Sequence, residues 1–137
     1  MEAARRAVID VGTNSIKLLV ADVSQDVRPV LEESKQTRLG RGFYNSHRLQ
    51  PEPIANTAKA VAVFASKARD LGASSIRVIA TSAARDAVNA AELVSAIEQA
   101  SELKVEIISG EQEAEWAFAI PEWLSATDYR NPPSGRF

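Results

Sequence analysis

Two short apolar runs joined by a tight turn constrain the fold of this chain most strongly. Residues 7–11 and 16–23 are rich in Ala, Val, Ile and Leu, and only the tetrapeptide Gly-Thr-Asn-Ser at 12–15 separates them. Each of these four residue types supports a turn or hydrogen-bonds its own backbone. Two buried strands with so short a connection form an antiparallel hairpin. The chain therefore has to build a β-sheet around this hairpin.

A third strand and a long helix are expected next. Residues 27–39 are predicted to form the strand, and Pro29 near its start favours a sheet edge or an irregular entry. The polar residues 40–50 are predicted to form a loop. Residues 51–71 are predicted to form the helix, because their apolar residues recur at the spacing of one helix face and Gly72 provides a stop. That apolar stripe consists of Ile54, Ala58, Val61, Ala65 and Ala68.

Strand and helix patterns alternate over the following residues. Strands are predicted at 76–80 and 105–108. A second helix is predicted from Ala83, with Asn89 capping its continuation to about Ser101, and a third over 111–118. A hairpin meander followed by such alternation predicts an α/β fold with a mixed five-stranded sheet and helices on its faces. Residues 1–120 are expected to form this domain, and 121–137 a divergent, poorly ordered tail rich in turn formers. The apolar face of the second helix is expected to include Leu93, Ile97 and Ala100.

Composition excludes several classes of chemistry. The chain has no Cys and a single His, which rules out thiol catalysis and Cys-based zinc sites and argues against a Ser-His-Asp triad. The formal net charge of −2 gives no basic excess for nucleic acid or acidic membranes. The apolar run at 16–21 is too short to span a bilayer, and no signal-peptide pattern is present. A cytoplasmic protein without nucleic-acid or membrane partners is therefore expected.

Candidate anion-binding groups follow the ends of three predicted buried strands. If these strands are parallel neighbours, the groups meet at one edge of the sheet, where open α/β sheets bind ligands. A Gly turn exposes backbone N–H groups to phosphate, and a nearby carboxylate can hold Mg²⁺ through water. An Arg fork matches phosphate oxygens, and an inward Glu can activate water. The groups are Asp10 with the 12–15 turn, then Thr81, Ser82 and Arg85, then Ser109 and Gly110 followed by Glu111, Glu113 and Glu115.

Each of these motifs also has a purely structural explanation. The first is equally typical of a hairpin turn capped by Asp10. The second is typical of a capped helix whose Arg85 is solvated or paired with Asp86. Glu residues in a first helical turn interact favourably with the helix dipole whatever their function. The convergence of all three motifs on one sheet edge is what favours a functional interpretation.

The three motifs together resemble those of the exopolyphosphatase/guanosine pentaphosphatase (Ppx/GppA) phosphatase family. Residues 7–15 are similar to its first phosphate loop, and residues 80–85 with Asn89 are similar to its second signature. Ile108-Ser109-Gly110 followed by Glu113-Ala114 matches its third. The resemblance covers residues 7–118, and three ordered motifs at compatible spacing make it specific.

The resemblance implies a fold, an activity and roles for individual residues. The fold would be a ribonuclease-H-like domain of the actin-like ATPase superfamily. The activity would be Mg²⁺-dependent hydrolysis of terminal phosphoanhydride bonds in polyphosphate or guanosine pentaphosphate. Glu113 would activate water, Arg85 would bind the phosphoryl group, and Asp10 would also be the Mg²⁺ ligand. The implied phosphate-binding residues are Asp10, Gly12, Thr13, Asn14, Ser15, Lys17, Thr81 and Ser82.

The chain departs from the family in lacking a second Gly-rich phosphate loop of the form Asp-x-Gly-Gly-Gly-Ser. The second domain of the family is therefore expected to be absent from this chain, which would be inactive in isolation. The alternatives are a catalytically silent anion-binding or interaction module with the same fold, and half of a sugar-kinase-like or chaperone-like ATPase. The motif at 109–114 favours the phosphatase.

Two surface features suggest further contacts. Residues 35–48 contain four basic side chains and no acidic one, which is typical of a solvated loop and also suits a polyanion. Large apolar residues crowd into 116–124, and a single domain rarely exposes such a patch unused. A homodimer through this segment is expected. The two sets are Lys35, Arg38, Arg41 and Arg48, and Trp116, Phe118, Ile120, Trp123 and Leu124.

Overall fold

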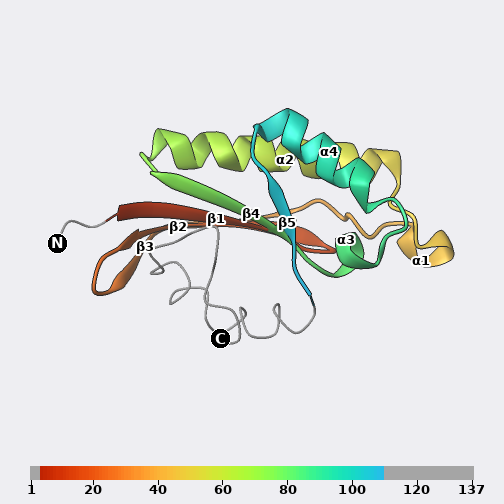
Figure 1. The fold of residues 1–137 in the computed structure, drawn as a ribbon, viewed down its shortest axis with the longest axis horizontal. Helices are drawn as coiled ribbons and strands as arrows, with labels where there is room; N and C mark the ends of the chain where they lie inside the picture. Colours follow the sequence, from red (N-terminus) through yellow and green to blue (C-terminus); the bar gives the residue numbers. More distant parts are fainter. Residues whose placement is uncertain (1–3, 110–137) are drawn as a thin grey trace.

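A computed structural model of the protein describes residues 4–109, which form one sheet and a layer of helices (Figure 1). Their order along the chain agrees with the predicted succession of a three-stranded meander and then alternating helices and strands. The elements are β1 (Ala4–Val11), β2 (Ser15–Val23), β3 (Val27–Gln36), α1 (Phe43–Ser46), α2 (Pro51–Asp70), β4 (Ser75–Ala80), α3 (Ser82–Asp86), α4 (Ala90–Ser101) and β5 (Val105–Ile107).

The five strands form one mixed sheet in the order β3-β2-β1-β4-β5. β1, β2 and β3 pair antiparallel, whereas β1, β4 and β5 run parallel to one another. This confirms the predicted fold class and the predicted hairpin. Pro29 lies on an edge strand next to a bulge, which are the positions in a sheet that tolerate proline.

β3 ends three residues earlier than the predicted Leu39. The N–H groups of Thr37 and Arg38 leave the ladder and donate instead to the carbonyl oxygen of Asn14, at 3.1 and 3.0 Å. The loop predicted over residues 40–50 also contains the short helix α1, which the polar composition of this segment did not indicate.

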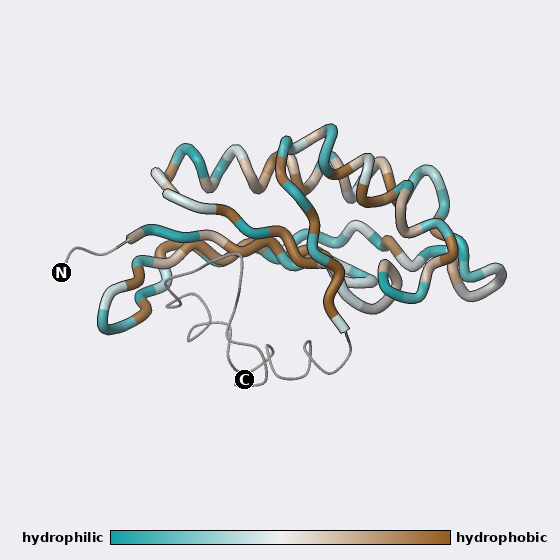
Figure 2. The backbone as a smooth tube through the Cα atoms, in the orientation of Figure 1, coloured by the Kyte–Doolittle hydropathy of each residue, from teal (hydrophilic) through white to brown (hydrophobic). Residues whose placement is uncertain are grey.

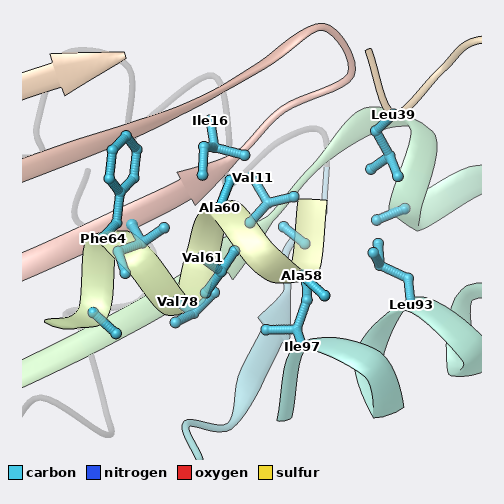
Figure 3. Packing of buried hydrophobic residues seen from close by; sticks show 14 of the residues in the cluster. Val11, Ile16, Leu39, Ala58, Ala60, Val61, Phe64, Val78, Leu93 and Ile97 are labelled. Atoms are coloured by element: carbon cyan, nitrogen blue, oxygen red, sulfur yellow. The ribbon is translucent and has the colours of Figure 1, made fainter. Parts of the chain in front are cut away.

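Helices α2 and α4 cover one face of the sheet, and the main core lies between these layers (Figure 1, Figure 3). Hydrophobic colour predominates in the middle of the sheet, whereas it alternates with hydrophilic colour along both helices (Figure 2). The predicted stripe of α2 is confirmed, since all five of its residues are buried. α2 ends at Asp70, followed by Gly72 at a φ of 81°.

Two expectations for α4 were wrong in detail. Ala100 is exposed, because the last turn of the helix buries Ser101 instead, and the Ser101 hydroxyl donates to the Ile97 carbonyl at 2.7 Å. Asn89 occupies the N-cap position, but its side chain makes no cap hydrogen bond. Its amide group is buried against the backbone of Leu49, with Oδ1 2.8 Å from Leu49 N and Nδ2 3.0 Å from Leu49 O.

An ion pair fastens the end of α2 to the sheet. The Arg5 guanidinium donates to both carboxylate oxygens of Asp22, at 2.8 and 3.0 Å, and to the carbonyl of Leu71 at 2.8 Å. Hydrogen bonding to Arg5 lowers the pKa of Asp22, and the same bond raises the pKa of Arg5.

The predicted helix at 111–118, the tail at 121–137 and the apolar segment 116–124 lie outside the described residues. Over residues 4–109, no helix has both the length and the apolar character needed to cross a membrane.

Candidate functional site

The carboxyl ends of the three parallel strands lie side by side, which is the condition under which the sequence analysis expected the motifs to meet. In the ladders Val11 is opposite Ala80, and Ala80 is opposite Ile107. Each strand then passes into a segment that carries candidate residues: Gly12 to Ser15 after β1, Thr81 to Arg85 after β4, and Ile108 and Ser109 after β5. The topology therefore brings the described parts of all three motifs to one edge of the sheet.

The turn between β1 and β2 is compact and closed on itself. The Gly12 N–H donates to the Ser15 carbonyl at 3.0 Å. A Cβ on Gly12 would lie 3.0 Å from that same oxygen, so a larger residue would push the turn open. Asn14 is exposed at the tip, whereas Thr13 and Ser15 are half-buried. The turn thus has a fixed backbone with polar side chains at its outer end.

The segment after β3 holds this turn from outside. The Gly40 N–H donates to the Thr13 carbonyl at 2.9 Å, and the N–H groups of Thr37 and Arg38 both donate to Asn14 O. A Cβ on Gly40 would lie 2.5 Å from Thr13 Cγ2. The sequence analysis did not assign this role to residues 37–40. The available signal was a glycine directly after a strand, which by itself indicates only a turn.

We expect Gly40→Ala to destabilise the protein by about 1–3 kcal/mol, because the added methyl group overpacks the contact with Thr13. Thr13→Ser removes the clashing methyl group and keeps the hydroxyl. The double variant Thr13→Ser/Gly40→Ala should therefore recover most of the loss. Urea unfolding of the four proteins in a double-mutant cycle measures this coupling. Equal losses in Gly40→Ala and the double variant would show that the contact with Thr13 is not the cause.

The start of α3 meets the same turn. The Ala83 N–H donates to Thr13 Oγ1 at 3.3 Å. Thr81 is buried, and its N–H and hydroxyl both point to the Val11 carbonyl, at 3.2 and 3.5 Å. Ser82 is the first residue of α3, and its side chain lies outside the described part of the structure. Val11 and Thr13 are therefore the residues of the first motif that contact the second motif.

Arg85 links α3 to the end of β5. Its Nη1 donates to the Ile108 carbonyl at 3.1 Å, and its Nε lies 3.9 Å from Asp86 Oδ1. The side chain is 29% exposed, so the guanidinium is anchored without being sealed from solvent. Its position beside Ile108 places it next to the segment that leads to Glu113.

Asp10 and Lys17 are direct neighbours on the face of the sheet that α2 and α4 leave uncovered. They are opposite each other in the β1–β2 ladder, and their side chains share one face. Both line a hollow of about 370 Å³ with Val8, Leu19 and Glu32. Asp10 is half-buried and Lys17 is exposed. The structure therefore places an acidic and a basic residue opposite each other near the strand end.

The third motif is only partly described. Ile108 is buried and Ser109 is exposed, whereas Gly110 and the three glutamates lie outside the described residues. The expected meeting of Asp10, Arg85 and Glu113 around one concavity therefore stays a prediction. Within residues 4–109, no three acidic, His or Cys side chains gather closely enough to hold a metal ion by themselves.

The sheet order and strand directions are those of the actin-like ATPase fold. The chain belongs to the Ppx/GppA phosphatase family, whose model matches residues 18–127. This match continues past Phe118, where the resemblance in the sequence had been expected to stop.

Curated relatives and solved structures agree with this membership. The chain is 39% identical over 140 residues to exopolyphosphatase 2 of Mycobacterium tuberculosis, covering 92% of this chain and 43% of that protein. It is 33% identical over 121 residues to a guanosine-5′-triphosphate,3′-diphosphate pyrophosphatase of Aeromonas hydrophila, covering 88% of this chain and 24% of the relative. The crystal structure of the Aquifex aeolicus family member matches with a TM-score of 0.80 and 28% identity, over 86% of this chain and 39% of that one. The chain thus spans less than half the length of each of these proteins.

Proposed function

We propose that the chain is the N-terminal domain of an exopolyphosphatase-like phosphohydrolase that cleaves terminal phosphoanhydride bonds of polyphosphate or guanosine pentaphosphate. Family membership supports the reaction class, and the two relatives above act, by their names, on these two kinds of substrate. The observation that carries the proposal is the meeting of the glycine turn and the start of α3 at Thr13, at the ends of the parallel strands.

The turn would bind phosphate through its outer end. Because the Gly12 N–H is already bonded to Ser15 O, Gly12 shapes the turn rather than contacting the ligand. The N–H groups of Thr13 and Asn14 and the hydroxyl of Ser15 are then the donors for phosphate oxygens. Thr81 holds β1 and β4 together at this edge, so its contribution is to position the turn.

Arg85 and Glu113 would act on the reacting phosphoryl group. Arg85 is held beside β5 by the Ile108 carbonyl, and from this position a planar guanidinium fork would match phosphate oxygens. Glu113 would accept a proton from the attacking water. Its role is carried over from the family motif, and the short chain distance from Ser109 is consistent with a place at the same edge.

The residues present fit a magnesium ion held largely by water and substrate. Mg²⁺ commonly takes one or two carboxylates together with substrate phosphates and keeps several waters. Asp10 supplies one such carboxylate, half-buried at the end of β1. The ion would neutralise charge on the phosphate chain. Lys17, opposite Asp10, would contribute a further positive charge toward phosphate.

We expect the native protein that contains this chain to release orthophosphate from polyphosphate or guanosine pentaphosphate only with Mg²⁺. The 137-residue chain tested by itself should release no more orthophosphate than its Glu113→Gln variant.

The reason is that phosphoryl transfer needs positioning and charge stabilisation around the whole phosphate group, and this chain carries no second Gly-rich loop. A phosphate-release assay with and without chelator measures both. Metal-dependent turnover by the chain alone would overturn the second expectation. Absence of release by the native protein, with anion binding retained, would favour the silent binding module.

Two further assignments belong to the same proposal. A cytoplasmic location suits an enzyme acting on nucleotide or polyphosphate substrates. Self-association would use the apolar segment at 116–124, whose aromatic residues are the type most favoured in interface cores.

A further inference from the structure

A second concentration of positive charge lies beside the β1–β2 turn, in a hollow that we call the basic pocket. It is formed by the end of β3, the segment that follows it and the first turns of α2, and its volume is about 240 Å³. Among the described residues that line it, the cations outnumber the acids: Lys35, Arg38, Arg41 and Lys59 against Glu52. The chain as a whole has a formal net charge of −2, so this excess is local.

The basic pocket and the hollow of Asp10 and Lys17 lie on opposite faces of the sheet. Lys35 is opposite Ile16 in the β2–β3 ladder, and directly opposed residues share a face. Ile16 belongs to the core beneath α2. The pocket is therefore on the helix-covered side, opposite the hollow of Asp10 and Lys17, and its backbone meets the 12–15 turn only where Thr37 and Arg38 donate to Asn14 O.

The charges in this pocket are poorly compensated. Arg41 Nη2 lies 3.7 Å from Glu52 Oε1, but both side chains are more than 60% exposed, and such pairs contribute little. Within residues 4–109, no ion pair links Lys35, Arg38 or Lys59 to an acid. By contrast, Arg48 from the same basic run pairs with Glu92 at 3.2 Å, and Lys67 of α2 pairs with Glu33 at 2.6 Å. The cations of the pocket therefore repel one another, whereas Arg48 and Lys67 nearby are each paired with an acidic residue.

The backbone of the pocket is held in an unfavourable conformation. Arg38 has a φ of 52°, in the left-handed region that residues with a Cβ seldom adopt. The hydrogen bond from its N–H to Asn14 O helps to fix this geometry. Thr37, which also lines the pocket, has a buried hydroxyl with no hydrogen-bond partner among the described residues. Residues in strained backbone conformations are held there by the surrounding structure, and they cluster at ligand-binding sites.

We propose that the basic pocket is a second anion site, which binds a phosphate oxyanion of one or two phosphate groups. The volume lies below the roughly 300–1,000 Å³ typical of sites for drug-sized ligands, so a small, highly charged ion fits it best. Such an ion offsets the repulsion among the cations and accepts hydrogen bonds from several of them. The ligand is either a free phosphate or pyrophosphate ion, or one segment of a longer polyphosphate. This inference does not depend on the proposed hydrolysis.

Calorimetric titration of the 137-residue chain with pyrophosphate at low ionic strength tests the site. The variant Lys35→Gln/Lys59→Gln should bind at least about tenfold more weakly, because two unit charges close to the anion are removed. The matched control Arg28→Gln/Lys104→Gln loses the same charge at exposed positions outside the pocket and should stay within about twofold. Equal losses in the pocket and control variants would reveal nonspecific attraction and overturn the proposal.

Backbone amide NMR during the same titration locates the ion independently. Shifts should concentrate at residues 35–38 and 56–59, and shifts confined to residues 12–15 would overturn the proposal. A parallel titration with long-chain polyphosphate identifies the source of the ligand. Saturation by pyrophosphate assigns a free ion, whereas binding of the long chain alone at the same residues assigns a substrate segment. All substituted side chains are exposed, and circular dichroism verifies that each variant is folded.

Discussion

Replacing Phe64 by Ala is expected to lower the free energy of unfolding by about 3–5 kcal/mol. Phe64 lies on α2 and is 4% exposed, and its ring packs between the helix and the sheet (Figure 3). Truncation leaves a cavity that the surrounding residues fill only partly. Domains of this kind are stable by about 5–15 kcal/mol, so the loss removes a large part of the total. Urea unfolding followed by circular dichroism measures it.

The neighbouring Val63 provides a control on the same helix. Its side chain is 47% exposed, so Val63→Ala should change the free energy of unfolding by no more than about 0.5 kcal/mol. Phe64→Leu keeps most of the buried volume and should fall between the two. The dependence on urea should keep the same slope in all variants, since the surface exposed on unfolding hardly changes. Similar losses for Val63→Ala and Phe64→Ala would mean that α2 does not cover the sheet as described.

Features that depend on neighbours in the sequence were predicted well. The hairpin followed from two apolar runs and a four-residue turn, and the stripe of α2 from apolar residues at helical spacing. Both patterns are complete within a single element or one connection. The parallel arrangement of β1, β4 and β5 entered the sequence analysis only as a condition, and the helices between these strands supply the crossover connections that it requires.

Features that depend on distant contacts were missed. The Asn89 amide pairs with the Leu49 backbone, 40 residues away in sequence, and this tertiary partner replaces the predicted cap. Gly40 is required by its approach to Thr13, and no local pattern distinguishes it from an ordinary loop glycine. The same holds for charge: the sequence showed the basic run at 35–48, but only the fold pairs Arg48 with Glu92 and groups the others with Lys59.

For the candidate site too, local features were predictable from the sequence and long-range contacts were not. The placement of its backbone segments followed from the order of strands, because strand ends of a parallel sheet meet at one edge. The contacts that position them did not, since the bond from Ala83 to Thr13 and the bond from Arg85 to Ile108 join residues that only the fold brings together. The sequence therefore identified where chemistry is possible, and the structure shows how its parts are held.

In the native protein that contains this chain, Glu113→Gln is expected to lower kcat by about 10²–10⁴-fold, the usual contribution of a general base. The amide keeps the size of the side chain but cannot accept a proton from water. Arg85→Lys should also lower kcat, because an ammonium group cannot offer the planar pair of donors that phosphate oxygens accept. Initial rates of phosphate release at saturating polyphosphate and Mg²⁺ measure both effects.

The variant Asp86→Asn tests whether the effect of Arg85→Lys on kcat comes from lost phosphate contacts or from a structural change in α3. Asp86 lies next to Arg85, its side chain is 64% exposed, and its oxygen is 3.9 Å from Arg85 Nε, too far for a strong bond. This variant should retain nearly full activity, because the Ile108 carbonyl rather than Asp86 anchors the guanidinium. A loss of activity in Asp86→Asn as large as in Arg85→Lys would assign Arg85 a structural role in α3. Full activity of Glu113→Gln would show that Glu113 is not the general base, because a glutamine side chain cannot accept a proton from water. The family motif at 109–114 would then serve the fold rather than the reaction.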